Sequence, residues 1–162
     1  MENTALTFEY DVPSIEEFES RIAVTIQKYP YLCIVSDGEI AGYAYAGALR
    51  SRAAYRWSAE LTIYLDRTAR GAGLGRCLYE ELEARLKAME IENLYACITC
   101  AAVAGDPYVT DTSEKFHTCM GFKKVGEFHR CGYKFNRWYG IIWMEKIIGA
   151  HGKKTVKTAP SI

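Results

Sequence analysis

The stretch that most constrains the fold is residues 59–89, which combine a strand, a glycine-rich loop and a helix. AELTIYL at 59–65 is a short apolar run of strand length. The glycine-rich loop follows at 67–76, and a long run of good helix formers follows the loop. One helical stripe of apolar residues consists of Leu74, Leu78, Leu82, Leu86 and Met89. The chain is therefore expected to build helices against a sheet.

The loop has the composition of a phosphate-binding site. Glycines at 71, 73 and 75 let successive backbone N–H groups turn inward, and a helix beginning near Gly75 adds its positive end. Arg70 and Arg76 add charge-assisted hydrogen bonds. Nucleotide P-loops require GxxxxGK[ST] and dinucleotide loops require GxGxxG, so neither matches. The spacing indicates a pyrophosphate site, with a plain glycine turn as the alternative.

The remaining elements follow from periodicity and turn residues. Ser14 and Glu17 form a capping box ahead of a helix that ends at Pro30, and Asp37-Gly38 joins two strands as a hairpin. Ser113 is expected to cap a short helix that ends at Gly121. Further strands are expected at 31–36, 39–48, 93–100, 122–131 and 137–146, with a loop at 101–112 and a turn at 132–136. The pattern predicts one mixed α/β domain.

Composition limits the possible functions. The chain has 162 residues with 20 basic and 20 acidic side chains, and this balance argues against nucleic-acid binding. No apolar run reaches the length of a membrane span, and the N-terminus has no apolar signal region, so we expect a cytoplasmic protein. Residues 1–148 are expected to form the domain and residues 149–162 a basic, flexible tail.

Cysteine spacing gives no sign of a metal or redox site. The six cysteines are expected to be free thiols, because a domain of this length builds an adequate core without disulfides. Cys97 and Cys100 form a CxxC on an expected strand, where residues three apart point to opposite faces. We therefore interpret this pair as packing residues and expect no bound metal.

Four further motifs stand in a fixed order around the glycine loop. They are R-x-A-Y-x-W-x-x-E at 52–60, S-x-x-F-H-x-x-x-G-F at 113–122, G-Y-K at 132–134 and Trp138. The loop itself, R-x-x-G-x-G at 70–75, resembles the acetyl-CoA motif of the GCN5-related N-acetyltransferases (GNAT). The whole set is similar to the phosphinothricin acetyltransferase-like branch of that family, over roughly residues 3–147.

The resemblance implies a fold and a coenzyme. The fold is a central mixed, mostly antiparallel twisted sheet with helices on both faces, here without the first strand and helix usual in the family. Acetyl-CoA is the implied acetyl donor, with no metal. Its pyrophosphate falls on Arg70, Gly71, Ala72, Gly73, Leu74, Gly75 and Arg76. Its pantetheine arm falls on Ile63, Tyr64 and Leu65, and Ser113 is expected to contact the coenzyme.

The resemblance also assigns catalytic and acceptor residues. Glu60 is the expected general base, because an ammonium must lose a proton before it attacks a thioester. His117 is expected to move a proton as well. Arg52, Tyr55 and Tyr133 are expected to face the acceptor. The alternatives are a surface glutamate, a structural histidine, a solvated loop arginine and an aromatic residue that only stacks.

The implied activity is direct acetyl transfer to the primary amine of a small molecule, such as an amino acid or analogue. Two alternatives are open: another acceptor (a polyamine, an antibiotic or a protein N-terminus), or a non-catalytic acetyl-CoA-binding module. Two departures bear on the acceptor. Thr110 stands where the resemblance leads us to expect an Asn. By the same resemblance, about twenty residues of the start usual in the family are expected to be missing from this sequence. A homodimer is expected, because the branch usually dimerises and a partner would cover the exposed sheet face.

Overall fold

The computed structural model describes residues 3–69, 71–103 and 105–154. These residues form three α-helices, one 3-10 turn and six strands. The helices are α1 (Ile15–Ile26), α2 (Leu74–Ala88) and α3 (Thr112–Cys119), and the 3-10 turn is η1 (Ala53–Tyr55). The strands are β1 (Tyr31–Ser36), β2 (Glu39–Ala48), β3 (Ser58–Leu65), β4 (Asn93–Ala101), β5 (Lys123–Lys134) and β6 (Arg137–Ile147).

All six described strands belong to one sheet, in the order β1-β2-β3-β4-β6-β5. Neighbouring strands are antiparallel except β3 and β4, which are parallel and are connected through α2. The mixed, mostly antiparallel sheet predicted from the sequence is therefore confirmed.

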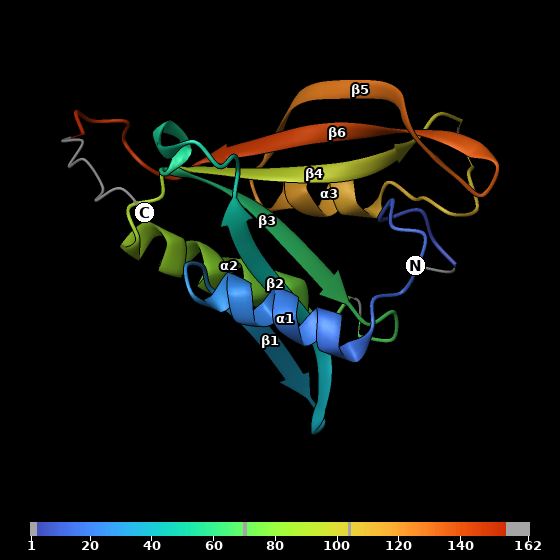
Figure 1. The fold of residues 1–162 in the computed structure, drawn as a ribbon, viewed down its shortest axis with the longest axis horizontal. Coiled ribbons are helices and arrows are strands. Elements are labelled where there is room, and N and C mark those ends of the chain that lie inside the picture. The colour runs from blue at the N-terminus through green and yellow to red at the C-terminus, as the bar shows by residue number, and fades with distance from the viewer. Residues whose placement is uncertain (1–2, 70, 104, 155–162) are drawn as a thin grey trace.

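The parallel pair β3–β4 is short. Pairing runs only from Ser58–Asn93 to Glu60–Tyr95, although both strands continue beyond these residues. Figure 1 shows the result: β3 and β4 start together and then diverge, so that β1–β3 and β4–β6–β5 form the two arms of a V. The sheet therefore opens at its centre.

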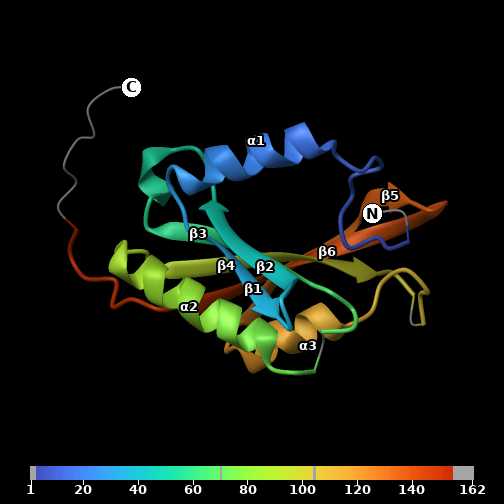
Figure 2. The same cartoon turned by 90° about the horizontal axis from the view of Figure 1, so that it is seen from below.

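Helices cover both faces of this opened sheet. Figure 2 shows α1 on one face and α2 and α3 on the other. The main core lies on the α2 face, where Leu82 and Leu86 of α2 pack against strand residues such as Leu61, Leu94 and Met144. Because side chains alternate along a strand, Glu60, Thr62 and Tyr64 of β3 point to the α1 face.

The contacts of α1 are mostly peripheral. The helix begins where predicted, with the Ser14 hydroxyl accepting from Glu17 N–H, but none of its residues is buried. Of the predicted apolar stripe, Phe18 and Ile22 are half-buried, whereas Ile15 and Ile26 are exposed. The Phe18 ring meets the edge of Tyr43 on β2, with ring centroids 5.9 Å apart.

Two predicted boundaries are corrected. The helix α3 begins at Thr112, with Asp111 as its N-cap and no side-chain capping bond, so Ser113 is the second helical residue rather than the cap. The β5–β6 turn is Phe135-Asn136, both with positive φ, and β5 extends to Lys134. Positive φ at both central residues is typical of a type I′ hairpin turn, whose twist matches the strands.

The described part of the C-terminal segment follows β6. Gly149 N–H donates to the Glu92 carbonyl, and Lys154 pairs with the Glu92 carboxylate at 2.7 Å. Residues 155–162 lie outside the described residues, so a flexible tail stays a prediction. Within residues 3–69, 71–103 and 105–154, no helix is long and apolar enough to cross a membrane. The six cysteines, all in that described part, are free.

Two glycines of β2 offer a matched test of packing at the opening. A Cβ on Gly42 would lie 2.5 Å from Leu65 Cδ2 and 2.7 Å from the Tyr64 carbonyl oxygen, whereas a Cβ on Gly47 meets nothing within 4 Å. We expect Gly42→Ala to lower the free energy of unfolding by about 1–3 kcal/mol through overpacking. Gly47→Ala should change it by less than about 1 kcal/mol. Urea unfolding of both variants measures the difference, and equal stabilities would contradict this packing.

Candidate active site

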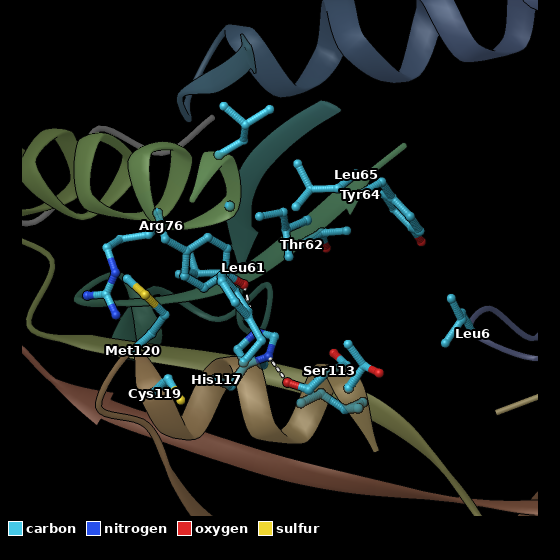
Figure 3. A pocket seen from close by; sticks show the side chains of 18 of the residues that line it. Leu6, Leu61, Thr62, Tyr64, Leu65, Arg76, Ser113, His117, Cys119 and Met120 are labelled. Carbon is cyan, nitrogen blue, oxygen red and sulfur yellow. Dashed lines mark hydrogen bonds between the residues drawn. The ribbon is translucent and has the colours of Figure 1, made fainter. Parts of the chain in front are cut away.

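The opening between β3 and β4 contains a cavity of about 700 Å³. Its lining comes from both arms of the sheet, from α2 and α3, and from the N-terminal segment (Figure 3). On the α2 side it reaches Tyr79 and His117, and on the α1 side it reaches Thr62, Tyr64 and Cys97. The cavity therefore passes through the sheet from one face to the other.

The predicted pantetheine strand borders this cavity. Ile63, Tyr64 and Leu65 all line it, and all lie beyond the point where β3 stops pairing with β4. On its other edge β3 pairs with β2 from Ala59 to Leu65. Beyond Glu60, no strand of the described part of the chain pairs with the edge of β3 that faces the opening. The backbone N–H and C=O groups on that edge require hydrogen bonds. A ligand that carries amides can supply them.

The glycine-rich loop lies at the mouth of the same cavity. Gly71 and Gly73 have φ of 85° and 78°, a left-handed conformation that favours glycine. Gly73 is the N-cap of α2, and Gly71, Gly73, Leu74, Gly75 and Arg76 line the cavity. The positive end of α2 therefore faces the cavity and suits an anion. Ala72 belongs to the same loop, whereas Arg70 lies outside the described residues.

Gly75 has a packing role in addition. A Cβ at this position would lie 3.0 Å from Leu65 Cδ1 and 3.1 Å from Phe116 Cε2. The absence of a side chain lets the first turn of α2 approach β3 and α3 closely. This close approach sets the distance between the helix N-terminus and the opening of the sheet.

Glu60 is the last residue of β3 that pairs with β4, at the vertex of the V. Its carboxyl is partly buried, and this desolvation raises its pKa, while the positive charge of Arg50 opposes the rise. Arg50 holds its guanidinium 5.7 Å from the centre of the Trp143 ring on β6. Arg50 was missed in the sequence, where only Arg52 of the same R-x-R was assigned to the site.

His117 lies on the opposite side, buried on α3 with 3% of its surface exposed. One ring nitrogen, Nδ1, lies 2.7 Å from the Ser113 carbonyl, which only accepts, so Nδ1 carries the hydrogen (Figure 3). Nε2 lies 2.7 Å from the Tyr79 hydroxyl and accepts from it. Burial lowers the pKa of His117, which keeps the ring neutral near pH 7.

Tyr79 and Cys97 are cavity residues that sequence reasoning missed. Tyr79 is 2% exposed, and its hydroxyl finds its partner in His117. The sequence offered one signal for Tyr79, which is its position in the second turn of the helix that follows the glycine-rich loop. A tyrosine that is buried there needs a hydrogen-bond partner for its hydroxyl. Cys97, which we interpreted as a packing residue, lines the cavity instead. Desolvation is the main cause that raises the pKa of its thiol to about 11, and the negative charge of Glu60 is the second. Cys100 does pack against the core.

The predicted acceptor residues lie apart from the cavity lining. Arg52 and Tyr55 belong to the exposed connection before β3, where Arg52 is the N-cap of η1. The Tyr133 ring packs at a tilt against the Trp138 ring near the β5–β6 turn, with ring centroids 5.1 Å apart and an interplanar angle of 59°. Ser113 lines the cavity. The contacts of these residues with an acceptor or a coenzyme stay predictions.

No group of three or more His, Cys, Asp or Glu side chains in the described ranges is placed to hold a metal ion. The cavity offers an anion site at a helix N-terminus and a strand edge open to a ligand. The Glu60 carboxylate, with its raised pKa, is not part of the lining but directly precedes the lining residue Leu61. This combination suits the transfer of a group from a long phosphorylated carrier.

Comparison with known proteins places the chain in a family. The family model described as "Acetyltransferase (GNAT) domain" matches residues 1–143. The chain belongs to the GNAT acetyltransferase family. Within that family it falls in the phosphinothricin acetyltransferase-like branch, as the motifs predicted.

Individual relatives agree with this assignment. A phosphinothricin N-acetyltransferase of Alcaligenes faecalis is 34% identical over 89% of this chain and 70% of its own length. An L-methionine sulfoximine/L-methionine sulfone acetyltransferase of Salmonella typhimurium is 29% identical over 76% of this chain and 67% of its own. A Sinorhizobium meliloti phosphinothricin acetyltransferase, solved in complex with acetyl-CoA, superposes with a TM-score of 0.85 at 32% identity, covering 98% of this chain and 84% of that one.

The electrostatic link between Arg50 and Glu60 can be tested without a substrate. Because the Arg50 charge lowers the pKa of Glu60, Arg50→Met should raise it further. The Glu60 carboxyl would then titrate at higher pH in a ¹³C NMR titration. Arg52→Met is the matched control, because Arg52 does not contribute to the pKa shift of Glu60. This variant should leave the pKa of Glu60 unchanged. An unchanged Glu60 titration in Arg50→Met would contradict the arrangement.

Proposed function

We propose that the chain transfers the acetyl group of acetyl-CoA to the primary amine of a small amino acid or analogue. The observation that carries this proposal is the cavity in the opened sheet, which is lined by the glycine-rich start of α2 and by β3 from Leu61 onward. Glu60 does not line it but directly precedes Leu61, at the vertex of the V. Because the lining includes side chains of both sheet faces, we expect donor and acceptor to enter from different sides and to meet between β3 and β4.

The residues present fit the donor. The N–H groups at the start of α2, with the left-handed Gly71 and Gly73, hold the pyrophosphate, and Arg76 adds a positive charge. The open edge of β3 at Ile63 and Leu65 binds the amides of the pantetheine arm. When bound, acetyl-CoA supplies an activated thioester carbonyl that a neutral amine attacks directly.

Glu60 takes the proton from the acceptor ammonium, directly or through one water. An ordinary glutamate, with a pKa near 4.3, is a weak base toward an amine. Desolvation raises the pKa of Glu60 and so makes it a stronger base. Its place at the vertex directs it to the α1 face, on the side where the acceptor enters.

His117 acts with Tyr79 on the other side of the cavity. The lone pair of Nε2 already accepts a hydrogen bond from the Tyr79 hydroxyl. The ring can therefore gain a proton only from Tyr79, which then takes a proton from another group. His117 in this tautomer is therefore a proton acceptor through Tyr79, whereas Glu60 is open to the acceptor side. We assign the principal base role to Glu60 for this reason.

The acceptor side that we propose has a cationic group near Glu60, and its lining mixes polar side chains such as Thr62 and Thr99 with the apolar Leu6. Arg50, held beside Glu60, suits the carboxylate of an amino acid, and Arg52 and Tyr55 lie two and five residues further along the same connection. Named relatives act on phosphinothricin or on methionine sulfoximine and sulfone, which are amino acid analogues. An amino acid with a short polar or apolar side chain is the acceptor class we propose.

A homodimer in the cytoplasm is the setting that we propose for this enzyme. The exposed apolar side chains Ile15, Val24 and Ile26 of α1 support self-association. Sedimentation at several concentrations tests it, and a monomer throughout would refute it.

If Glu60 is the general base, its replacement should lower kcat without weakening the binding of acetyl-CoA. Glu60→Gln keeps the shape of the side chain but removes the base, so kcat should fall by about 100-fold or more. The Kd for acetyl-CoA, measured by calorimetry, should stay within about twofold, because pyrophosphate binding lies at α2. Glu39→Gln, at the exposed start of β2, is the control and should retain activity.

Release of free thiol from acetyl-CoA with a panel of amines tests the activity itself. Amino acids and their analogues should be acetylated in preference to polyamines, aminoglycosides or peptide N-termini. Binding of acetyl-CoA without turnover on any amine would overturn the enzyme proposal and favour a coenzyme-binding module. Near-normal kcat in Glu60→Gln would remove Glu60 from the base role.

A further inference from the structure

The N-terminal segment, residues 5–10, forms part of the cavity wall. Leu6 lines the cavity and lies across it from Arg76 in Figure 3. The Thr99 hydroxyl, also in the lining, donates to the Leu6 carbonyl at 3.4 Å. Ala5 is fully buried, and its N–H donates to the Tyr108 carbonyl at 3.2 Å. The segment is therefore fitted onto the sheet rather than loosely attached.

Lys134 fastens this segment to β5. The residue is 3% exposed, and its ammonium donates to the backbone carbonyls of Thr7, at 3.1 Å, and Glu9, at 2.7 Å. A buried ammonium is costly unless it is hydrogen-bonded, and a charged donor makes stronger hydrogen bonds than a neutral one. The position of residues 7–9 is thus linked to the burial of Lys134.

The two residues before Lys134 contribute to the same attachment. The Phe8 ring lies against Gly132, where any Cβ would be 2.4 Å from the ring. The Tyr10 hydroxyl donates to the Tyr133 carbonyl. Three consecutive residues of β5, 132–134, therefore hold residues 7–10 in one register, and this register places Leu6 at the cavity.

The wall that is fixed in this way lies on the acceptor side. Thr99 of β4, which bonds the segment at Leu6, and the lining residue Tyr64 of β3 both belong to the α1 face. The N-terminal segment runs beside β5 and β6 in Figure 2. The donor contacts at Gly71–Arg76 lie at the other mouth. A shift of the segment would therefore change the space for the acceptor and leave the phosphate contacts in place.

We infer that Lys134 is a positioning residue for acceptor selection, holding residues 5–10 so that Leu6 limits the size of the acceptor side chain. This inference rests on the proposed acetyl transfer. Lys134 contacts neither reactant; it acts through the backbone of Thr7 and Glu9. Leu6 is the specificity residue, because it supplies the side chain that faces the cavity.

The first test removes the ammonium while keeping the length of the side chain. Lys134→Met should raise the KM for the acceptor about tenfold, as expected for the loss of charged hydrogen bonds, with the Kd for acetyl-CoA unchanged. Lys134→Arg retains a charged donor and should restore most of the acceptor KM. Lys123→Met, an exposed lysine on the same strand, is the matched control and should behave as the natural protein.

A second readout needs no activity. Hydrogen exchange of the Ala5 amide should be protected in the natural protein and in Lys123→Met, and should accelerate in Lys134→Met. Unchanged exchange and an unchanged acceptor KM in Lys134→Met would overturn the inference. If the natural protein acetylates no amine, the proposed function fails, yet the exchange experiment still decides whether Lys134 holds the segment.

Leu6 gives an independent test that does not depend on the folding of a Lys134 variant. Leu6→Ala should increase kcat/KM for amino acids with longer side chains relative to short ones, because it enlarges the acceptor end of the cavity. An unaltered preference would show that Leu6 does not limit the acceptor and would refute that part of the inference.

Discussion

The rest of the site depends on the early separation of β3 from β4. A parallel pair normally continues along both strands, yet here pairing stops at Glu60–Tyr95 and the strands diverge. Facing backbone groups beyond that point require hydrogen-bond partners, since a buried unpaired amide is costly. An amide-bearing arm threaded between the strands satisfies them. The start of α2 lines this gap and Glu60 lies at its vertex, so one irregularity of the sheet brings together the donor site and the base that we propose.

Desolvation shifts the pKa values of Glu60 and His117, the two groups proposed to move protons, in opposite directions. The carboxyl of Glu60 has a raised pKa and the imidazole of His117 a lowered one, because burial disfavours the charged form of each. The first becomes a better base and the second stays neutral, fixed between the Ser113 carbonyl and Tyr79. The N-terminal segment completes the acceptor end, and its register is set from β5 by Lys134. In this account β3 and α3 carry the groups proposed for proton transfer, whereas the N-terminal segment and β5 determine which acceptor is selected.

Local patterns predicted much of the fold. The limits of β1 and β2 match the prediction because Asp37-Gly38, with positive φ at both residues, fixes the hairpin. The predicted cap of α3, Ser113, lies two residues after the observed cap, Asp111, because both residue types favour the cap position and local sequence does not decide between them. The cavity could be predicted only from the family resemblance, because the separation of β3 from β4 depends on tertiary packing and not on local sequence. Arg50 and Leu6 were not assigned to the site, and Cys97 was interpreted as a packing residue, because only the assembled sheet brings them to Glu60 and the opening.

The most direct measurement is a crystal structure of the chain with acetyl-CoA bound. We expect the pyrophosphate on the amides at the start of α2, the pantetheine arm in the gap between β3 and β4, and the thioester between Glu60 and the Tyr79–His117 pair. A coenzyme whose arm lies along the outer surface of α2 or α3, with the gap between the strands unfilled, would contradict the central role given to the opened sheet.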